Sequence, residues 1–118
     1  MWETTISAMR TDELKKGSAE FLILSLLEHE PRHGYELSKL IESRSRGAIT
    51  FQVATLYPLL ARMEDRGWIA GRWIEAPGQR RRRVYGITRE GMKALAAQRR
   101  NWREFVTAIG LVSRTRRA

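Results

Sequence analysis

The sequence predicts a mainly α-helical fold that carries one small β-hairpin. Most of the chain places apolar residues at intervals of three and four, which is the period of a helix with one buried face. Between residues 68 and 87 the period changes to two, and aromatic and β-branched residues become frequent, as in strands. A length of 118 residues with 42% hydrophobic residues is enough for the core of one small domain.

Basic side chains outnumber acidic ones by 22 to 13, and the net charge of +9 on so short a chain indicates an anionic partner. We expect nucleic acid first, then a membrane surface or an acidic protein. The chain has no cysteine, which excludes disulfides, thiol catalysis and cysteine-based zinc sites. No apolar run is long enough to span a membrane and no secretory signal is recognisable, so we expect a cytoplasmic protein.

We expect residues 1–13 to form a mobile arm or a short leading helix, because they are mixed polar without a clear period. A helix over 14–29 follows that is apolar on almost all sides, as in a helix packed against two neighbours. It ends before Pro31, since the residue preceding a proline disfavours helical dihedral angles. Lys15 and Lys16 stand in its first turn, where the helix dipole does not favour cations, so they are either solvated or bound to an external anion.

A turn at 31–34 leads into a second helix over 35–45, and 49–51 is a short extended segment. A third helix is expected over 52–66, with apolar residues at helical spacing and Gly67 as its C-terminal cap.

Pro58 lies inside this third helix, where it removes a hydrogen bond and crowds the preceding turn. The helix is therefore either kinked at Pro58 or regular only from about Tyr57 onward. The sequence leaves both alternatives open.

The strand-like runs 68–75 and 82–87 flank Pro77 and Gly78, a pair suited to a type II turn. They predict a β-hairpin with a basic tip. The tip carries four consecutive arginines: Arg80, Arg81, Arg82 and Arg83. Because alternate side chains of a strand point to opposite faces, at least two of them should be free to meet phosphates. The alternative is a solvated loop.

Thr88 is placed to cap a long helix over 89–112, which a basic tail at 113–118 follows. An apolar seam with heptad spacing runs along it: Met92, Leu95, Arg99, Trp102, Val106 and Ile109. Arg99 is the polar break in the seam. The sequence suggests no other core for this seam, and an exposed apolar stripe favours aggregation unless a partner covers it. We therefore expect a homodimer formed through this helix.

The order of these elements, helix, helix, short strand, helix and hairpin, is that of a winged helix-turn-helix. We expect 14–88 to form a DNA-binding domain and 89–112 to form a dimerisation helix. A helix on a compact base fits the major groove of DNA, which is about 12 Å wide, and a hairpin beside it reaches the neighbouring backbone or minor groove. A two-fold dimer then requires a pseudo-palindromic site on double-stranded DNA.

A set of ordered motifs resembles the PadR family of transcriptional regulators over about residues 14–110. The motifs are PRHGYEL at 31–37, ATLYPLLARME at 54–64, WI at 68–69, RRRVYGIT at 81–88 and EG at 90–91. The resemblance implies a helix that tolerates Pro58 and, as in the small subgroup, a last helix that is the main dimerisation element. It also implies that planar compounds bind at the dimer interface of some small members.

The chain departs from the family pattern where the third helix begins. Members often have a small hydroxyl residue, an acidic residue and glycine before Thr-Leu-Tyr, whereas this chain has Gln52, Val53 and Ala54. The usual serine-type cap is therefore missing, and Thr50 is the alternative cap. Gln52 either reads adenine edges through its amide or is a solvated residue at the start of the helix.

The candidate DNA contacts are Lys15, Lys16, Tyr35, Gln52, Thr55, Tyr57, Arg80, Arg81, Arg82 and Arg83. Thr55 and Tyr57 offer hydroxyls to phosphate oxygens, and the alternative for Tyr57 is packing against the wing. Tyr35 is expected to pack in the core with its hydroxyl on a phosphate. Trp102 and Arg99 are candidate contacts for a small planar effector, and the alternative for Trp102 is ordinary dimer core.

No nucleophile–base pair, phosphate-binding glycine loop or paired carboxylate motif marks an enzyme, and we expect neither catalysis nor a cofactor. His29 and His33 have a metal-like spacing, but Pro31 breaks the helix between them, so we expect no metal site.

We expect a homodimeric, sequence-specific DNA-binding repressor of one or a few neighbouring genes, released by a small aromatic effector. The alternative is a winged-helix module for protein–protein interaction that does not bind DNA. A membrane-surface role is disfavoured, because the basic residues cluster on a hairpin and not along an amphipathic helix.

Overall fold

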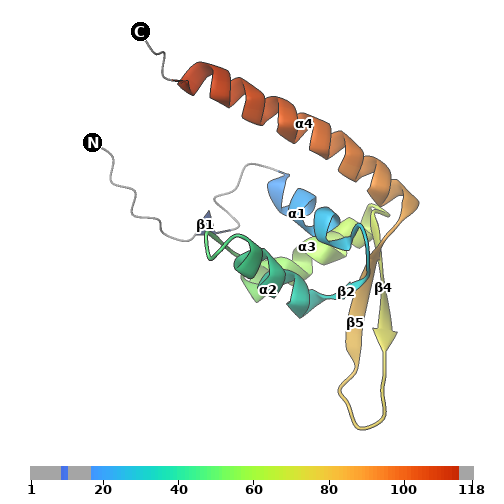
Figure 1. The fold of residues 1–118 in the computed structure, drawn as a ribbon. Helices are drawn as coiled ribbons and strands as arrows, with labels where there is room; N and C mark the ends of the chain where they lie inside the picture. Colours follow the sequence, from blue (N-terminus) through green and yellow to red (C-terminus); the bar gives the residue numbers. More distant parts are fainter. Residues whose placement is uncertain (1–8, 11–16, 115–118) are drawn as a thin grey trace.

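The computed structural model describes residues 9–10 and 17–114, and its helices and hairpin follow the expected order (Figure 1). The helices are α1 (Ser18–Leu27), α2 (Gly34–Arg44), α3 (Val53–Asp65) and α4 (Arg89–Ser113). The strands are β1 (Met9–Arg10), β2 (Arg32–His33), β3 (Ile49–Thr50), β4 (Ile69–Ile74) and β5 (Arg82–Ile87). The prediction of a mainly helical fold with a small β-hairpin is confirmed.

The N-terminal predictions fall mostly outside the described residues. Outside them lie Lys15, Lys16, residues 1–8 and 11–16 as a whole, and residues 115–118 of the basic tail. Of the expected arm, the structure describes only β1, which pairs in parallel with β3. α1 begins at Ser18 after Gly17, whose φ of 88° lies in the left-handed region, and it ends at Leu27.

The hydrophobic core lies between α1, α2 and α3, with additions from the hairpin and α4. Its largest fully buried side chains are Ile23, Leu24, Leu27, Leu37, Leu56, Leu60, Met63 and Leu95. Each side chain of this size contributes about 1.5–3 kcal/mol when it leaves water. α4 runs across α1 and then extends beyond it, so only its first part packs on the domain (Figure 1).

The hairpin belongs to a three-stranded antiparallel sheet in the order β2-β5-β4. β4 and β5 pair along 6 residues each, as predicted. On the other side of β5, Arg32 pairs with Tyr85 and His33 with Val84. The sequence predicts only a turn at 31–34, because a two-residue strand has no period to detect. This pairing fixes the hairpin, which we call the wing (69–87), to the start of α2.

α3 ends in the glycine cap that the sequence predicts. Gly67 has a φ of 79°, a left-handed conformation that side chains with a Cβ rarely adopt. The amide of Gly67 donates to the carbonyl of Glu64 at 2.9 Å, and the amide of Trp68 donates to the carbonyl of Met63 at 3.0 Å. These are the two hydrogen bonds of a Schellman motif, and they set the direction in which the chain enters β4.

The junction between the wing and α4 is also fixed by a predicted cap. The Thr88 hydroxyl accepts from the amide of Gly91 at 3.0 Å and donates to the carbonyl of Gly67. A Cβ on Gly91 would collide with the carbonyl oxygen of Trp68 at 2.0 Å, so only glycine allows this approach of α4 to the wing.

The start of α3 excludes one of the two alternatives for Pro58. The helix begins at Val53 and continues through Pro58, so the alternative of a regular helix only from about Tyr57 is wrong. Its N-cap is Gln52, which makes no side-chain cap hydrogen bond. Thr50 lies in β3, two residues before the N-cap position.

Candidate nucleic-acid interface

α3 presents one face of its N-terminal half to solvent. Leu56 is fully buried, whereas Gln52, Thr55 and Tyr57 are exposed around it. An exposed helix end on a compact base has the shape that enters a major groove. Val53, which is 50% exposed, lies on the same surface and was not singled out from the sequence. Its apolar side chain suits contact with a thymine methyl group.

Tyr57 lies against the first residue of α2. A Cβ on Gly34 would be 2.8 Å from Cε1 and 2.9 Å from the hydroxyl of Tyr57, so glycine leaves the space that this ring occupies. The ring is 41% exposed despite this contact. Tyr57 therefore links the exposed face of α3 to the start of α2, an arrangement that neither sequence alternative described.

Tyr35 is 57% exposed, so the expectation that it packs in the core is wrong. The buried stripe of α2 follows Gly34, Leu37, Ser38 and Ile41. Position 35 lies off that stripe. The Lys39 ammonium stands 5.2 Å from the Tyr35 ring centroid, and a hydrogen bond with Tyr35 raises the pKa of Lys39. The i, i+4 spacing of this pair on a helix is the signal that could have identified Lys39.

A groove of about 460 Å³ separates the wing from the starts of α2 and α3. Its lining residues are His33, Gly34, Tyr35, Glu36, Tyr57, Trp73, Arg80, Arg81, Arg82 and Arg83. The structure thus brings together most of the predicted DNA contacts, while Gln52 and Thr55 lie on the adjoining part of α3. Trp73, 54% exposed, was missed because its strand position does not reveal which face meets solvent.

Two of the four consecutive arginines of the wing are available to an external anion. Arg80 and Arg82 are exposed and have no ion-pair or hydrogen-bond partner among the described residues. The Arg81 guanidinium is stacked 4.4 Å from the Trp73 centroid and lies 3.7 Å from a carboxylate oxygen of Glu75.

Arg83 is held by the protein itself. Its Nη2 donates to Oε2 of Glu64 at 2.9 Å, and its side chain is only 29% exposed. The sequence treats the four arginines alike, because the acidic partner on α3 is remote in the chain.

Arg32, in the PRHGYEL motif, joins the end of α1 to the start of α2. Its Nε donates to the carbonyl of Leu26 at 2.8 Å, and its Nη1 lies 3.1 Å from a carboxylate oxygen of Glu36. The other oxygen of Glu36 accepts from the amide of His33 at 3.3 Å. Arg32 is a basic residue near the wing whose contacts are structural.

The first part of the α4 seam packs within the protomer. Leu95 is 1% exposed and belongs to the core, so the expectation that the seam has no core of its own is wrong there. The Trp102 ring lies 6.2 Å from that of Phe21 on α1 and 5.5 Å from that of Phe105. Arg99 forms an ion pair with Glu28 at 2.7 Å. α1 lies beneath this stretch of α4, a contact that heptad spacing does not reveal.

The remaining apolar residues of α4 are exposed. Met92 is 41%, Val106 51% and Ile109 48% exposed. Leu111 and Val112, which the seam did not include, are 64% and 88% exposed.

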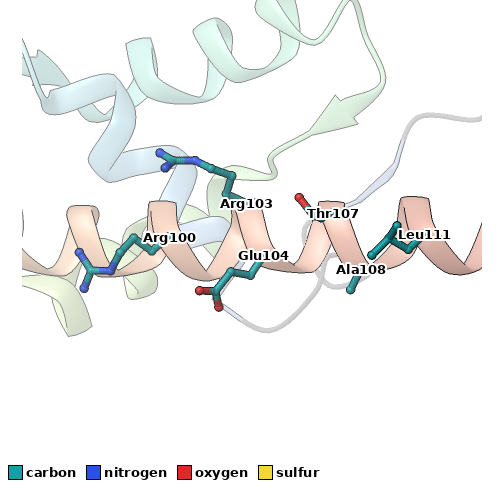
Figure 2. A pocket seen from close by; sticks show the side chains of 6 residues that line it. All are labelled: Arg100, Arg103, Glu104, Thr107, Ala108 and Leu111. Carbon is teal, nitrogen blue, oxygen red and sulfur yellow. The ribbon is translucent and has the colours of Figure 1, made fainter.

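Another side of α4 carries a shallow hollow of about 450 Å³ (Figure 2). It is lined by Arg100, Arg103, Glu104, Thr107, Ala108 and Leu111. All of these side chains come from one helix, so the hollow has no second wall. Val106 and Ile109 are not among its lining residues.

Neither a metal cluster nor a membrane span is found in the part of the chain that the structure describes. Within residues 9–10 and 17–114, no group of three histidine, aspartate or glutamate side chains is placed to hold a metal ion. No helix of these residues is both long and apolar enough to cross a membrane.

Three helices, a short strand and a hairpin with a basic end define this chain as a winged helix-turn-helix protein. A sequence profile of the transcriptional regulator PadR-like family matches residues 23–97, which is more than half of the chain. The chain therefore belongs to the PadR-like family of transcriptional regulators. This is the family that the sequence motifs resemble. Its members are transcriptional regulators, in agreement with the expectation that the chain is not an enzyme.

Solved structures agree with this assignment. The chain is 31% identical to a transcriptional regulator from Clostridium thermocellum, with a TM-score of 0.76 over 84% of this chain and 96% of that one. It is 31% identical to a PadR family transcriptional regulator from Eggerthella lenta, with a TM-score of 0.74 over 86% of each chain. Bacillus subtilis PadR in complex with operator DNA shares the fold, at 20% identity and a TM-score of 0.65 over 72% of this chain and 48% of that one.

Proposed function

We propose that this protein is a homodimeric, sequence-specific DNA-binding repressor. Each protomer places the N-terminal half of α3 in a major groove, and its wing contacts the adjacent phosphate backbone or minor groove. The observation that carries the proposal is that α3, which exposes Gln52 and Thr55, also contributes Tyr57 to the groove lined by the wing residues Arg80 and Arg82. Base edges are read by the helix, and phosphates are held by the arginines.

The fold shared with Bacillus subtilis PadR in complex with operator DNA supports DNA binding by this fold. The net charge of +9 supports it as well, because phosphate neutralisation supplies much of the affinity of DNA-binding proteins. A pseudo-palindromic operator follows from a two-fold dimer.

The dimer is proposed to form along the exposed part of α4. Val106 and Ile109 extend past the domain on a helix whose first half is already packed on α1. A second copy that covers this stripe removes an apolar surface that would otherwise promote aggregation. Met92, 41% exposed near the start of α4, extends the stripe toward the domain.

A planar aromatic effector is proposed to stack on Trp102 near the dimer axis. The ring is 36% exposed, so one part of it remains open beside its contact with Phe21. Arg99 reaches such a ligand only by leaving its pair with Glu28. Quenching of tryptophan fluorescence by planar compounds, absent in Trp102→Leu, tests this proposal.

The central test is a mobility shift with a duplex from the region upstream of the protein's own gene. We expect a discrete complex that an unrelated duplex does not displace, and a steep fall of log K with log salt, because a dimer makes on the order of 6–10 phosphate contacts. A flat salt dependence, or equal binding to all duplexes, would contradict sequence-specific binding. Capture by acidic proteins without any DNA complex would favour the protein-interaction alternative.

A further inference from the structure

The carboxylate of Glu64 joins α3 to the wing at two points. Its Oε2 accepts from the backbone amide of Gly71 at 2.9 Å and from Nη2 of Arg83 at 2.9 Å. Gly71 lies on β4, which is the edge strand of the sheet. Glu64 is the second-last residue of α3, the helix whose other end carries Gln52 and Thr55. One side chain thus connects the proposed reading helix to both strands of the wing.

The backbone of β4 is shaped to receive the Arg83 guanidinium. A Cβ on Gly71 would be 2.8 Å from Nε of Arg83 and 3.0 Å from its Cζ and Nη2. The guanidinium therefore lies directly over the position where any other residue would place a side chain. Gly71 does not have a positive φ, so its backbone conformation does not require glycine. Its missing side chain instead leaves the space that the Arg83 guanidinium occupies.

Two aromatic rings complete the surroundings of this guanidinium. The Cζ of Arg83 lies 5.3 Å from the centroid of Trp73 and 5.8 Å from that of Tyr85. Aromatic faces attract cations, and a carboxylate hydrogen bond to a guanidinium is stronger than a neutral one. With its side chain 29% exposed, Arg83 is partly withdrawn from the solvent that Arg80 and Arg82 face.

We propose that Arg83 is a positioning residue that locks the wing to α3 through Glu64, and that it is not a phosphate ligand. The lock sets the direction in which Arg80 and Arg82 project relative to the reading face of α3. This inference rests on the proposed DNA-binding function. It divides the arginine run, with one member holding the wing in place and the unpartnered members contacting phosphates.

The charge of Glu64 makes the inference testable. Glu64→Gln removes one negative charge from each protomer, so electrostatics alone would tighten binding to DNA. A lock predicts the opposite, because a neutral amide oxygen holds the guanidinium more weakly than a carboxylate does. The direction of the change separates the two explanations.

The experiment measures fluorescence anisotropy on a duplex that the full-length chain selects from a random pool, across a salt series. We expect Glu64→Gln and Arg83→Gln each to weaken binding about fivefold, and the double variant to be no weaker than either one. Arg83→Gln should leave the slope of log K against log salt unchanged. Arg82→Gln should reduce that slope by about 1 for each lost phosphate contact.

Two glycines of the wing give a matched pair of variants. Gly71→Ala should weaken binding as Arg83→Gln does, because the new methyl group displaces the guanidinium. Gly86→Ala should bind like the parent chain, since a Cβ there meets nothing within 4 Å. Hydrogen exchange gives a readout without DNA: Glu64→Ala should speed exchange of the Gly71 amide, and thermal unfolding of each variant confirms that it folds.

The outcomes separate this inference from the proposed function. If the parent chain selects no duplex, DNA binding itself is refuted, and unchanged Gly71 exchange in Glu64→Ala would independently refute the lock. If the parent chain binds but Glu64→Gln binds as well or better, the lock is overturned. A salt slope that falls in Arg83→Gln as it does in Arg82→Gln would identify Arg83 as a phosphate ligand.

Discussion

Arg99 on α4 and Glu28 at the end of α1 form a two-bond ion pair between positions 71 residues apart in the sequence, with distances of 2.7 and 3.2 Å. Glu28 is the C-cap residue of α1, where the helix dipole disfavours a carboxylate, and Arg99 interrupts the apolar seam of α4. The hydrogen bond from Arg99 lowers the pKa of Glu28, and that to Glu28 raises the pKa of Arg99. The pair therefore orients α4 on the domain.

We predict that Arg99→Gln lowers the midpoint of thermal unfolding at pH 7, and that the difference from the parent chain shrinks in acid. The folded-state pKa of Glu28 is below its ordinary value of 4.5. The pair therefore stabilises the fold above pH 4.5, and this contribution is lost as the pH falls through the lower folded-state value. Unfolding midpoints from pH 7 down to pH 3 measure the effect.

Two controls accompany this measurement. Arg100→Gln changes the same charge one residue further on, at an exposed position without an ion pair among the described residues, and should leave the midpoint nearly unchanged. His29 lies 3.7 Å from Glu28 in both chains, so only the difference between them reports on the pair of Arg99 with Glu28. A difference that is constant from pH 7 to pH 3 would contradict the role assigned to Glu28.

A second prediction concerns the contact of Tyr57 with α2. Gly34→Ala should weaken operator binding, because the added methyl group displaces the Tyr57 ring from its contact with α2. The stability of the fold should change by only about 0.5 kcal/mol, because the displaced ring is partly exposed and can move. Tyr57→Phe keeps the ring and removes the hydroxyl, so it should weaken binding without a change in stability. Equal DNA affinity in Tyr57→Phe and the parent chain would exclude a phosphate contact by the hydroxyl.

A third prediction separates the reading helix from the wing. Gln52→Ala and Thr55→Ala should lose about 1–3 kcal/mol of binding free energy on the operator and much less on unrelated DNA, as expected when a base contact is removed. Arg80→Gln with Arg82→Gln should weaken both duplexes alike, because phosphates carry little sequence information. Competition titrations give both affinities. Equal losses on both duplexes for the helix variants would mean that base reading lies elsewhere.

The sequence predicts those parts of the fold whose signals are local. Gly67 and Thr88 were recognised because a cap is defined by residues within one helical turn. β2 was missed because two residues have no period, and its pairing with β5 depends on a strand some fifty positions away. The spacing of apolar residues identified the core face of each helix. It did not show whether Tyr35, in the first turn of α2, belongs to the buried stripe of that helix.

The sequence predicted which residues form the candidate site. It did not predict the role of each residue. Four consecutive arginines identify a basic wing, yet the division between Arg82 and Arg83 depends on Glu64, which is 19 residues from Arg83. The seam of α4 has the same limit. Its heptad spacing finds the apolar face, whereas the position of α1 decides that Leu95 is covered by the protomer and that Val106 is not. Contacts between remote segments decide both cases.

The last prediction tests the dimer on the exposed part of α4. Val106→Glu places a charge in the centre of the uncovered apolar stripe, at a position that is 51% exposed in the protomer, so the fold should remain intact. If a second copy covers this stripe, the buried charge lacks a partner and the dimer should dissociate. Operator binding should weaken strongly, because each half-site is then bound without the linkage that a dimer provides. Ala108→Glu is the matched control, since it adds the same charge two residues further on, about 200° around the helix from Val106 and in the hollow of Figure 2. Sedimentation velocity should find the parent chain and Ala108→Glu as dimers and Val106→Glu as a monomer. A dimeric Val106→Glu chain would place the interface on another surface, and a monomeric parent chain would refute the homodimer, because the uncovered stripe would then have no second copy to bury it.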